Sequence, residues 1–244
     1  MLLLSIYKEK ECGMLCLIIG QINKGLIMVE KDPLLRIEIA ELNVKAGNQR
    51  LDRSDFGTAT SYFSVALSLL PDDHWKSMYN FSLPLYYSVA KAAYSSGNLE
   101  KAQKALKKII DESKQLPEKL QALNLLVTVL VEQNAREEAF TTSCEVLSNF
   151  GEVIPDSFDK KNARAMVKET STMLGSLENF QHKIKPADQK TQYCLMFYSH
   201  LPNVAYYIKP AISKYCKCAT ELFILSSKLS DNFSFIIQST IFCL

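Results

Sequence analysis

Small and large apolar residues recur at helical spacing in three parts of the chain, each time after a short polar break. In each part an alanine is followed by a second residue four positions on and a third residue seven positions on. That spacing places the three residues on one face of a helix. The three sets are Ala59, Phe63 and Ala66; Ala102, Leu106 and Ile109; and Ala139, Ser143 and Val146. They are 43 and then 37 residues apart, which is typical of a solenoid built from helix pairs.

The apolar positions between the breaks predict three pairs of helices. We expect these over 35–51 and 56–70, over 74–96 and 99–113, and over 120–131 and 135–150. Ser54 or Asp55 is expected to cap the second helix, and Pro71 is expected to stop it. Pro84 should kink or divide the third helix because it donates no amide hydrogen. Gly151 is expected to end the sixth.

The rest of the chain is less regular. The segment 15–26 fits a short helix or a buried strand, and further helices are expected near 161–174, 188–200 and 211–228. Alternation of the strand type is scarce. The sequence therefore predicts an all-α chain, a right-handed α-solenoid, in four parts. These are an irregular or short-helical segment (1–34), three helix pairs (35–151), more divergent helical hairpins (152–230) and an apolar tail without assignment (231–244).

Composition narrows the partners and the compartment. Hydrophobic residues make up 48% of the 244 positions, and a net charge of +2 is spread without a block of like charge. Nucleic acid or an acidic membrane surface would call for a basic stripe, so neither is expected as a partner. Seven scattered cysteines are an odd number for a disulfide framework. The opening MLLLSIYKEK is a poor signal peptide, and no apolar run reaches about 18 residues. A cytoplasmic protein is expected.

The first helix pair resembles a tetratricopeptide repeat. Gly47 falls twelve residues before Ala59, and Phe63, Ala66 and Pro71 follow at the offsets of that repeat. The small residues let the two helices approach closely, and Phe63 fills the space toward the next unit. The second and third pairs keep the helical stripe and are best called tetratricopeptide-like.

A longer resemblance covers most of the chain. The run Gln21–Gly47 looks like a junction in large multidomain signalling proteins, and so do the stretches 54–75 and 92–106. In that family a protein-kinase-like domain and a nucleotide-binding signalling ATPase domain precede this helical region, and a histidine kinase often follows it. The resemblance implies that residues 1–34 are the remnant of a junction with an upstream domain.

Three functional hypotheses follow from this resemblance. The first is a non-catalytic scaffold that couples other domains of the same polypeptide. The second is a free-standing adaptor that binds a protein or peptide. The third is an enzyme with an unrecognised site, for which the kinase and ATPase motifs are absent from the chain.

The candidate chemical motifs are weak. Residues 20–25 have the glycine spacing of a phosphate loop, but Leu26 and Ile27 replace the required Lys and Ser or Thr. His74, His182 and His200 have no neighbour at metal-ligand spacing. No catalytic, cofactor-binding or metal-binding residue is therefore assigned.

Aromatic residues gather around one hairpin, at Trp75, Tyr86, Tyr87 and Tyr94. Large aromatic side chains bury well, so we expect most of this group to be core. Tyr86 and Tyr87 are the candidates for anchoring a partner.

Overall fold

The protein is described here from a computed structural model, which covers residues 15–26, 32–155 and 189–227, with 161, 165 and 168 as isolated positions. Within these residues the chain forms helices and no strand, so the all-α prediction is confirmed for them. The helices are α2 (Leu15–Lys24), α3 (Pro33–Leu51), α4 (Phe56–Leu69), α5 (His74–Ser77), α6 (Tyr79–Ser95), α7 (Leu99–Glu112), α8 (Leu116–Glu132), α9 (Arg136–Asn149), α11 (Gln189–Tyr198), α12 (Leu201–Ile208) and α13 (Pro210–Ser227).

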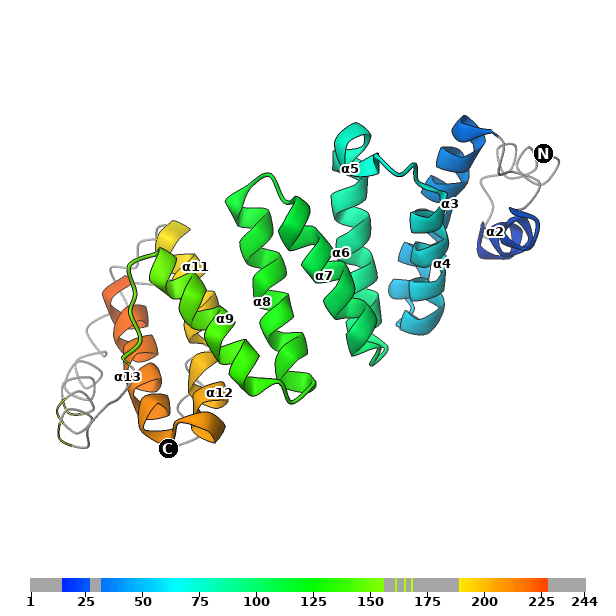
Figure 1. The fold of residues 1–244 in the computed structure, drawn as a ribbon. Coiled ribbons are helices and arrows are strands. Elements are labelled where there is room, and N and C mark those ends of the chain that lie inside the picture. Colours follow the sequence, from blue (N-terminus) through cyan, green and yellow to red (C-terminus); the bar gives the residue numbers. More distant parts are fainter. Residues whose placement is uncertain are drawn as a thin grey trace, which may run out of the picture. The chain divides into compact units, whose positions relative to one another are not determined.

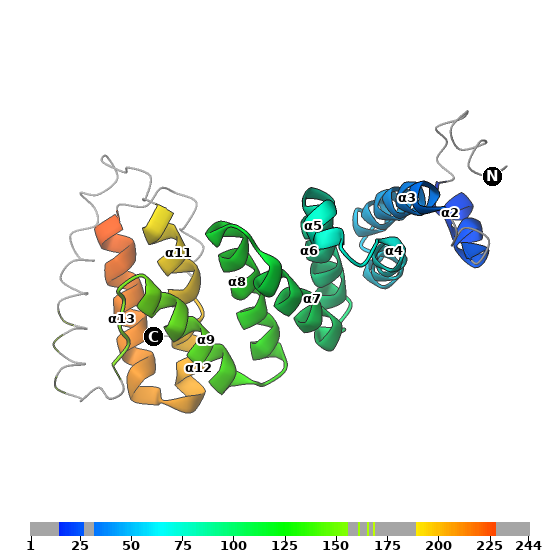
Figure 2. The ribbon, with the colours of Figure 1, turned by 45° about the horizontal axis from the view of Figure 1, so that its top comes forward.

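The chain forms two compact units, Met1–Ala122 and Leu123–Leu244, and the division falls inside α8. The sequence had suggested a change of character later, after residue 151. In the first unit α3 packs against α2 and α4, while α6 packs against α4, α5 and α7 (Figure 1). In the second unit α9 and α13 each contact both α11 and α12, which Figure 2 shows from another side.

The observed boundaries differ from the expected ones at three places. The segment that fitted either a helix or a strand is the helix α2. The break expected at Pro84 lies earlier, at Met78, and α6 continues through Pro84, which is exposed. The helix α12 lies between the two helices expected near 188–200 and 211–228 and was not expected. Its Pro202 stands in the first turn, where proline is well tolerated. The expected helix over 161–174 and the tail 231–244 lie largely or wholly outside the described residues.

Three hairpin turns share one backbone geometry. Each turn contains a single residue with positive φ: Ser54 at 58°, Gly97 at 78° and Asn134 at 62°. In every case the amide of that residue donates to the carbonyl three positions back, and the next amide donates to the carbonyl five positions back. This is the Schellman pattern, which satisfies the last carbonyls of a helix. The polar breaks of the sequence are therefore the same turn used three times.

The residue after each positive-φ position begins the next helix. Asp55 accepts a hydrogen bond from the amide of Thr58, and Asn98 accepts one from the amide of Lys101. At the third turn Ala135 has no side-chain oxygen, so α9 begins without such a cap. The capping expected at Ser54 or Asp55 is thus made by Asp55, while Ser54 supplies the positive φ.

Gly47 and Phe63 fix the approach of α3 to α4. A Cβ atom on Gly47 would lie 2.4 Å from Cε1 of Phe63, which is too close for any real side chain. Phe63 itself is fully buried. The remaining stripe residues are also buried: Ala59, Ala66, Ala102, Leu106, Ile109, Ala139, Ser143 and Val146. Pro71 directly follows Leu70, the C-cap residue of α4, and is half-buried.

Two polar contacts attach α2 to this hairpin. Asn23 and Asn43 exchange reciprocal amide hydrogen bonds of 2.7 and 3.0 Å, and the fully buried Asn43 also donates to the carbonyl of Ile39. The hydroxyl of Tyr62 donates to the carbonyl of Cys16 at 2.8 Å. Because buried amides must be paired, this pairing holds α2 in one register on α3.

The close contact between Gly47 and Phe63 predicts a reversal of sign in a double-mutant cycle. Gly47→Ala alone should destabilise the protein by about 1 to 3 kcal/mol, because the new methyl group overpacks the site. Phe63→Ala should cost about 3 to 5 kcal/mol. In the Phe63→Ala background, Gly47→Ala should instead stabilise by up to about 1 kcal/mol, since alanine is the better helix former and the ring is gone.

Urea denaturation of the four proteins measures this cycle. Gly57→Ala is the matched control, because a Cβ on this α4 glycine meets nothing within 4 Å. Independent, additive effects of Gly47→Ala and Phe63→Ala would contradict the proposed contact.

Candidate functional site

The predicted partner residues lie beside a cluster of aromatic rings on α5 and α6. Tyr86 stacks on His74 with the ring centroids 5.8 Å apart, and it meets Trp75 at 4.9 Å. Tyr79 approaches Trp75 edge-on at 5.9 Å. We call these four residues the aromatic cluster. Trp75 is buried, so the cluster packs α5 onto the first turns of α6.

His74 and Ser82 form a hydrogen-bonded pair within this region. The His74 Nδ1 atom lies 2.8 Å from the Ser82 hydroxyl, which donates its proton to the His74 carbonyl at 3.1 Å. Because that hydroxyl has a single proton, both contacts are hydrogen bonds only in the tautomer in which Nδ1 is the donor. A nucleophilic serine needs the opposite arrangement, with the histidine accepting its proton. Ser82 is also fully buried, so the pair joins α5 to α6.

Burial and the charge of Lys108 lower the pKa of His74. The imidazole is therefore neutral at neutral pH, which suits its stacking on Tyr86 and its hydrogen bond with Ser82.

Tyr79 and Tyr87 tie α6 to the start of α8 through Glu118. The hydroxyl of Tyr79 donates to the Glu118 carboxylate at 2.5 Å and accepts from the amide of Lys114 at 2.9 Å. The hydroxyl of Tyr87 donates to the backbone carbonyl of Glu118. Burial, followed by the charge of Glu118, raises the pKa of Tyr87 to about 12. The Tyr87 hydroxyl is therefore engaged within the first unit.

The ring of Trp75 packs in the core, whereas its indole nitrogen makes no hydrogen bond within the described residues. The indole nitrogen Nε1 is buried and has no hydrogen-bond partner within the described residues. An unpaired buried donor costs about 1 to 3 kcal/mol. The burial of the large ring must offset that cost, so the residue stabilises the fold through packing.

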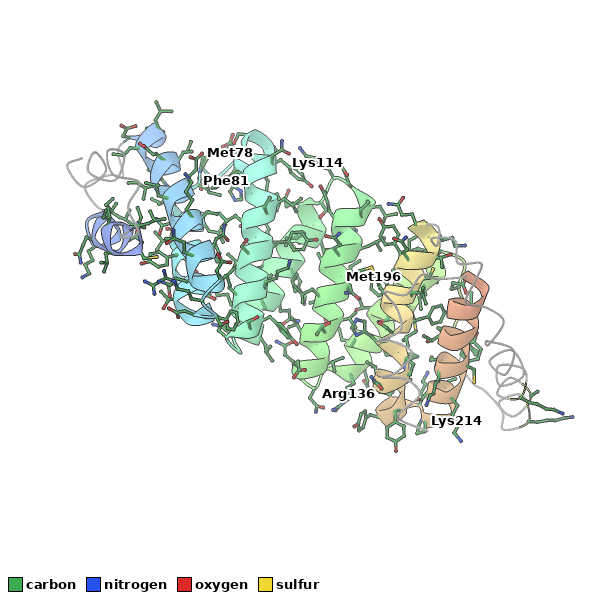
Figure 3. All side chains as sticks on the ribbon, turned by 180° about the vertical axis from the view of Figure 1, so that it is seen from behind. Met78, Phe81, Lys114, Arg136, Met196 and Lys214 are labelled. Carbon is green, nitrogen blue, oxygen red and sulfur yellow. The ribbon has the colours of Figure 1, made fainter. Side chains whose placement is uncertain are left out.

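A second group of aromatic residues, in the second unit, is exposed. Tyr206 and Tyr207 near the end of α12 are 63% and 66% exposed, and their rings meet at right angles at 5.3 Å. The guanidinium carbon of Arg136 on α9 lies 4.3 Å from the centre of the Tyr207 ring. Figure 3 shows Arg136 at the end of the second unit where Lys214 also lies.

Sequence reasoning missed this exposed pair. Adjacent helical residues point about 100° apart and can both be buried, as Phe197 and Tyr198 are. The exposure of Tyr206 and Tyr207 therefore depends on how α12 packs, which the sequence pattern does not reveal.

The histidines, cysteines and glycine loop of the sequence show no catalytic arrangement among the described residues. Residues 20–24 are helical, whereas a phosphate loop needs free amides in a turn. No three His, Cys, Asp or Glu side chains group as metal ligands in the described part of the chain. Burial, and then Cys144, raise the pKa of Cys216 to about 12, which makes its thiol unreactive. His182 lies outside the described residues.

His200 is held in the second unit. Its Nε2 atom lies 3.0 Å from the amide oxygen of Asn124 on α8, and burial lowers its pKa. This contact joins the start of α12 to α8, so it positions the segment that carries the exposed tyrosines.

Comparison with known proteins does not identify a family for this chain. No protein-family model matches this chain, and no curated protein matches it. In addition, none of the helices within the described residues is both long and apolar enough to cross a membrane.

Tyr87→Phe tests whether Tyr87 joins helices. Removing its hydroxyl deletes the hydrogen bond to the Glu118 carbonyl, so the free energy of unfolding at pH 7 should fall by about 1 kcal/mol. The folded pKa is raised above the ordinary value of about 10, so the stabilising effect of Tyr87 should fade as the pH rises above about 10. Urea denaturation at pH 7 and pH 11 measures both effects; a loss that stays constant between these pH values would argue against this role.

The lowered pKa of His200 predicts that the protein loses stability in mild acid. Because its folded pKa is lowered, the unfolded chain takes up a proton first as the pH falls through about 6.5, and unfolding becomes easier. His200→Gln should flatten the decline in unfolding free energy between pH 7 and pH 5. His74 has the same direction of shift, so some decline should persist. An unchanged slope in His200→Gln would show that His200 does not contribute.

Proposed function

We propose that this protein is a non-catalytic helical scaffold that binds protein segments. The observation that supports it is the repeated hairpin: three helix–turn–helix elements close with the same turn and bury the same stripe. Hairpins of this kind bury their apolar faces against one another and offer their outer faces for binding. The polar side chains around the aromatic cluster form hydrogen bonds that join one helix to another, as we expect in a scaffold.

The proposed task is to couple domains in a signal-transduction protein of the ATPase or kinase type. This part of the proposal rests on the resemblance of Gln21–Gly47 to a junction between domains. The hairpin of α3 and α4, whose first helix begins within that run, is tightly packed around Gly47 and Phe63, so it could transmit a displacement as a rigid element.

A cytoplasmic location belongs to the same proposal. Cys16 and Cys216 are buried free thiols. Buried free thiols fit a reducing compartment, where cysteine acts as a small apolar side chain.

The decisive experiment is stoichiometric binding. The genomic sequence flanking this chain identifies any in-frame domain, and crosslinking with mass spectrometry identifies separate partners. Each candidate is then produced alone and titrated against the full chain by calorimetry. We expect saturable binding to at least one of them, with an affinity of about micromolar.

The outcome also separates the hypotheses. Binding of an in-frame ATPase or kinase domain supports coupling within one polypeptide, whereas binding of a separate protein supports the adaptor. If no candidate binds, the scaffold proposal fails. Turnover of ATP or GTP by the purified chain would point instead to an enzyme.

A further inference from the structure

The end of the second unit around α12 combines exposed aromatic rings with positive charge. Tyr206 and Tyr207 expose about two thirds of their surface, although large aromatic side chains usually bury most of theirs. Tyrosine and arginine are also the residues that most often dominate protein–protein binding. Two such tyrosines beside Arg136 therefore form a surface that costs free energy to leave in water.

Arg136 is held in place and keeps hydrogen-bonding capacity. Its guanidinium lies over the Tyr207 ring, and one nitrogen donates to the side-chain oxygen of Asn134 in the preceding turn. A guanidinium has five N–H donors in a planar fork. Stacking on a ring leaves the edges of that fork free, so Arg136 can bind a carboxylate through two parallel hydrogen bonds.

Lys209 adds positive charge two residues after Tyr207. It stands between α12 and α13, is exposed, and its Nζ atom lies 5.8 Å from the Phe140 ring centre. Phe140 is one turn from Arg136 on α9, so both cations belong to this part of the surface. Lys214, in the second turn of α13, is exposed at the same end (Figure 3).

The local charge favours a peptide over nucleic acid. Glu137 and Glu138 follow Arg136 in the first turn of α9 and are exposed. A phosphate backbone requires a continuous row of cations, and these carboxylates interrupt such a row. A single carboxylate placed on Arg136 requires no such row.

We infer that Arg136, Tyr206, Tyr207 and Lys209 form a docking surface for an acidic peptide segment of a partner protein. A Glu or Asp of the segment binds the Arg136 fork, a neighbouring apolar side chain lies on the two tyrosine rings, and Lys209 attracts a second carboxylate. This rests on the proposed function, since it names the chemistry of the partner. The surface lies outside the first unit, in which Tyr86 and Tyr87 were the candidates.

The test uses the full chain and fluorescent synthetic peptides. Each peptide carries two Glu residues flanking a Leu or Phe, and a matched peptide carries Gln in place of Glu. Fluorescence anisotropy should show saturable binding of the acidic peptides and binding about tenfold weaker for the Gln peptides. Arg136→Gln and Tyr207→Ala should each weaken acidic-peptide binding by about tenfold.

Two control variants lie in the same unit but outside the surface. Lys190→Gln removes one exposed positive charge, and Val153→Ala truncates an exposed apolar side chain. Both should bind the acidic peptides as the unaltered chain does. Thermal unfolding by circular dichroism should show all four variants folded, because the altered side chains are at least partly exposed.

Other results would overturn the inference. Equal binding of acidic and Gln peptides, or equal loss in the Lys190→Gln control, would remove the role of Arg136. Tighter binding of a poly-uridine oligonucleotide, lost in Tyr207→Ala, would assign the surface to single-stranded RNA. Self-association in sedimentation velocity, lost in the same variant, would assign it to a second copy of the chain.

The failure of this inference can be told from failure of the proposed function. If a partner found by calorimetry binds Arg136→Gln and Tyr207→Ala as tightly as the unaltered chain, this surface is wrong and the scaffold stands. If neither a partner nor an acidic peptide binds the unaltered chain, both proposals fail.

Discussion

The contact between Gly47 and Phe63 is the constraint on which the first unit depends. The Phe63 ring occupies the space in which a Cβ at position 47 of α3 would lie, so the two helix backbones approach at a distance that only glycine permits there. Their packing buries the first stripe and brings Tyr62 within reach of the Cys16 carbonyl on α2. The attachment of α2 and the packing of α6 on α4 both build on this hairpin.

Polar groups in the first unit mainly hold helices together. The amide pair of Asn23 and Asn43 fixes α2 on α3, and Glu118 receives the hydroxyls of Tyr79 and Tyr87 from α6. Such bonds add modest stability, but each leaves a costly unpaired group if its partner is lost. They specify one arrangement of the helices. In the second unit Tyr206 and Tyr207 of α12 keep most of their surface exposed, which is why binding is proposed there.

The all-α class was predictable from the sequence, whereas the surface formed by Tyr206, Tyr207 and Arg136 was not. Helical spacing of apolar residues located the described hairpin helices to within a few residues, because that periodicity reflects which face is buried. The break near Pro84 was misplaced, since an exposed proline can be carried within a helix whose other face is packed. Tyr87 was chosen as a partner residue because aromatic type alone does not reveal that its hydroxyl reaches Glu118.

By itself, the sequence determined the helices, their turns and the buried stripe, because spacing, turn residues and small side chains act locally along the chain. The polar breaks of the sequence contain Ser54, Gly97 and Asn134, and each of these residues takes the positive φ of the turn. Only the tertiary structure decided which aromatic side chains make internal contacts and which remain exposed. Tyr86 on α6 meets His74 and Trp75 on α5, while Tyr207 on α12 meets Arg136 on α9. Contacts between residues distant in sequence depend on how helices pack, and no local pattern encodes them.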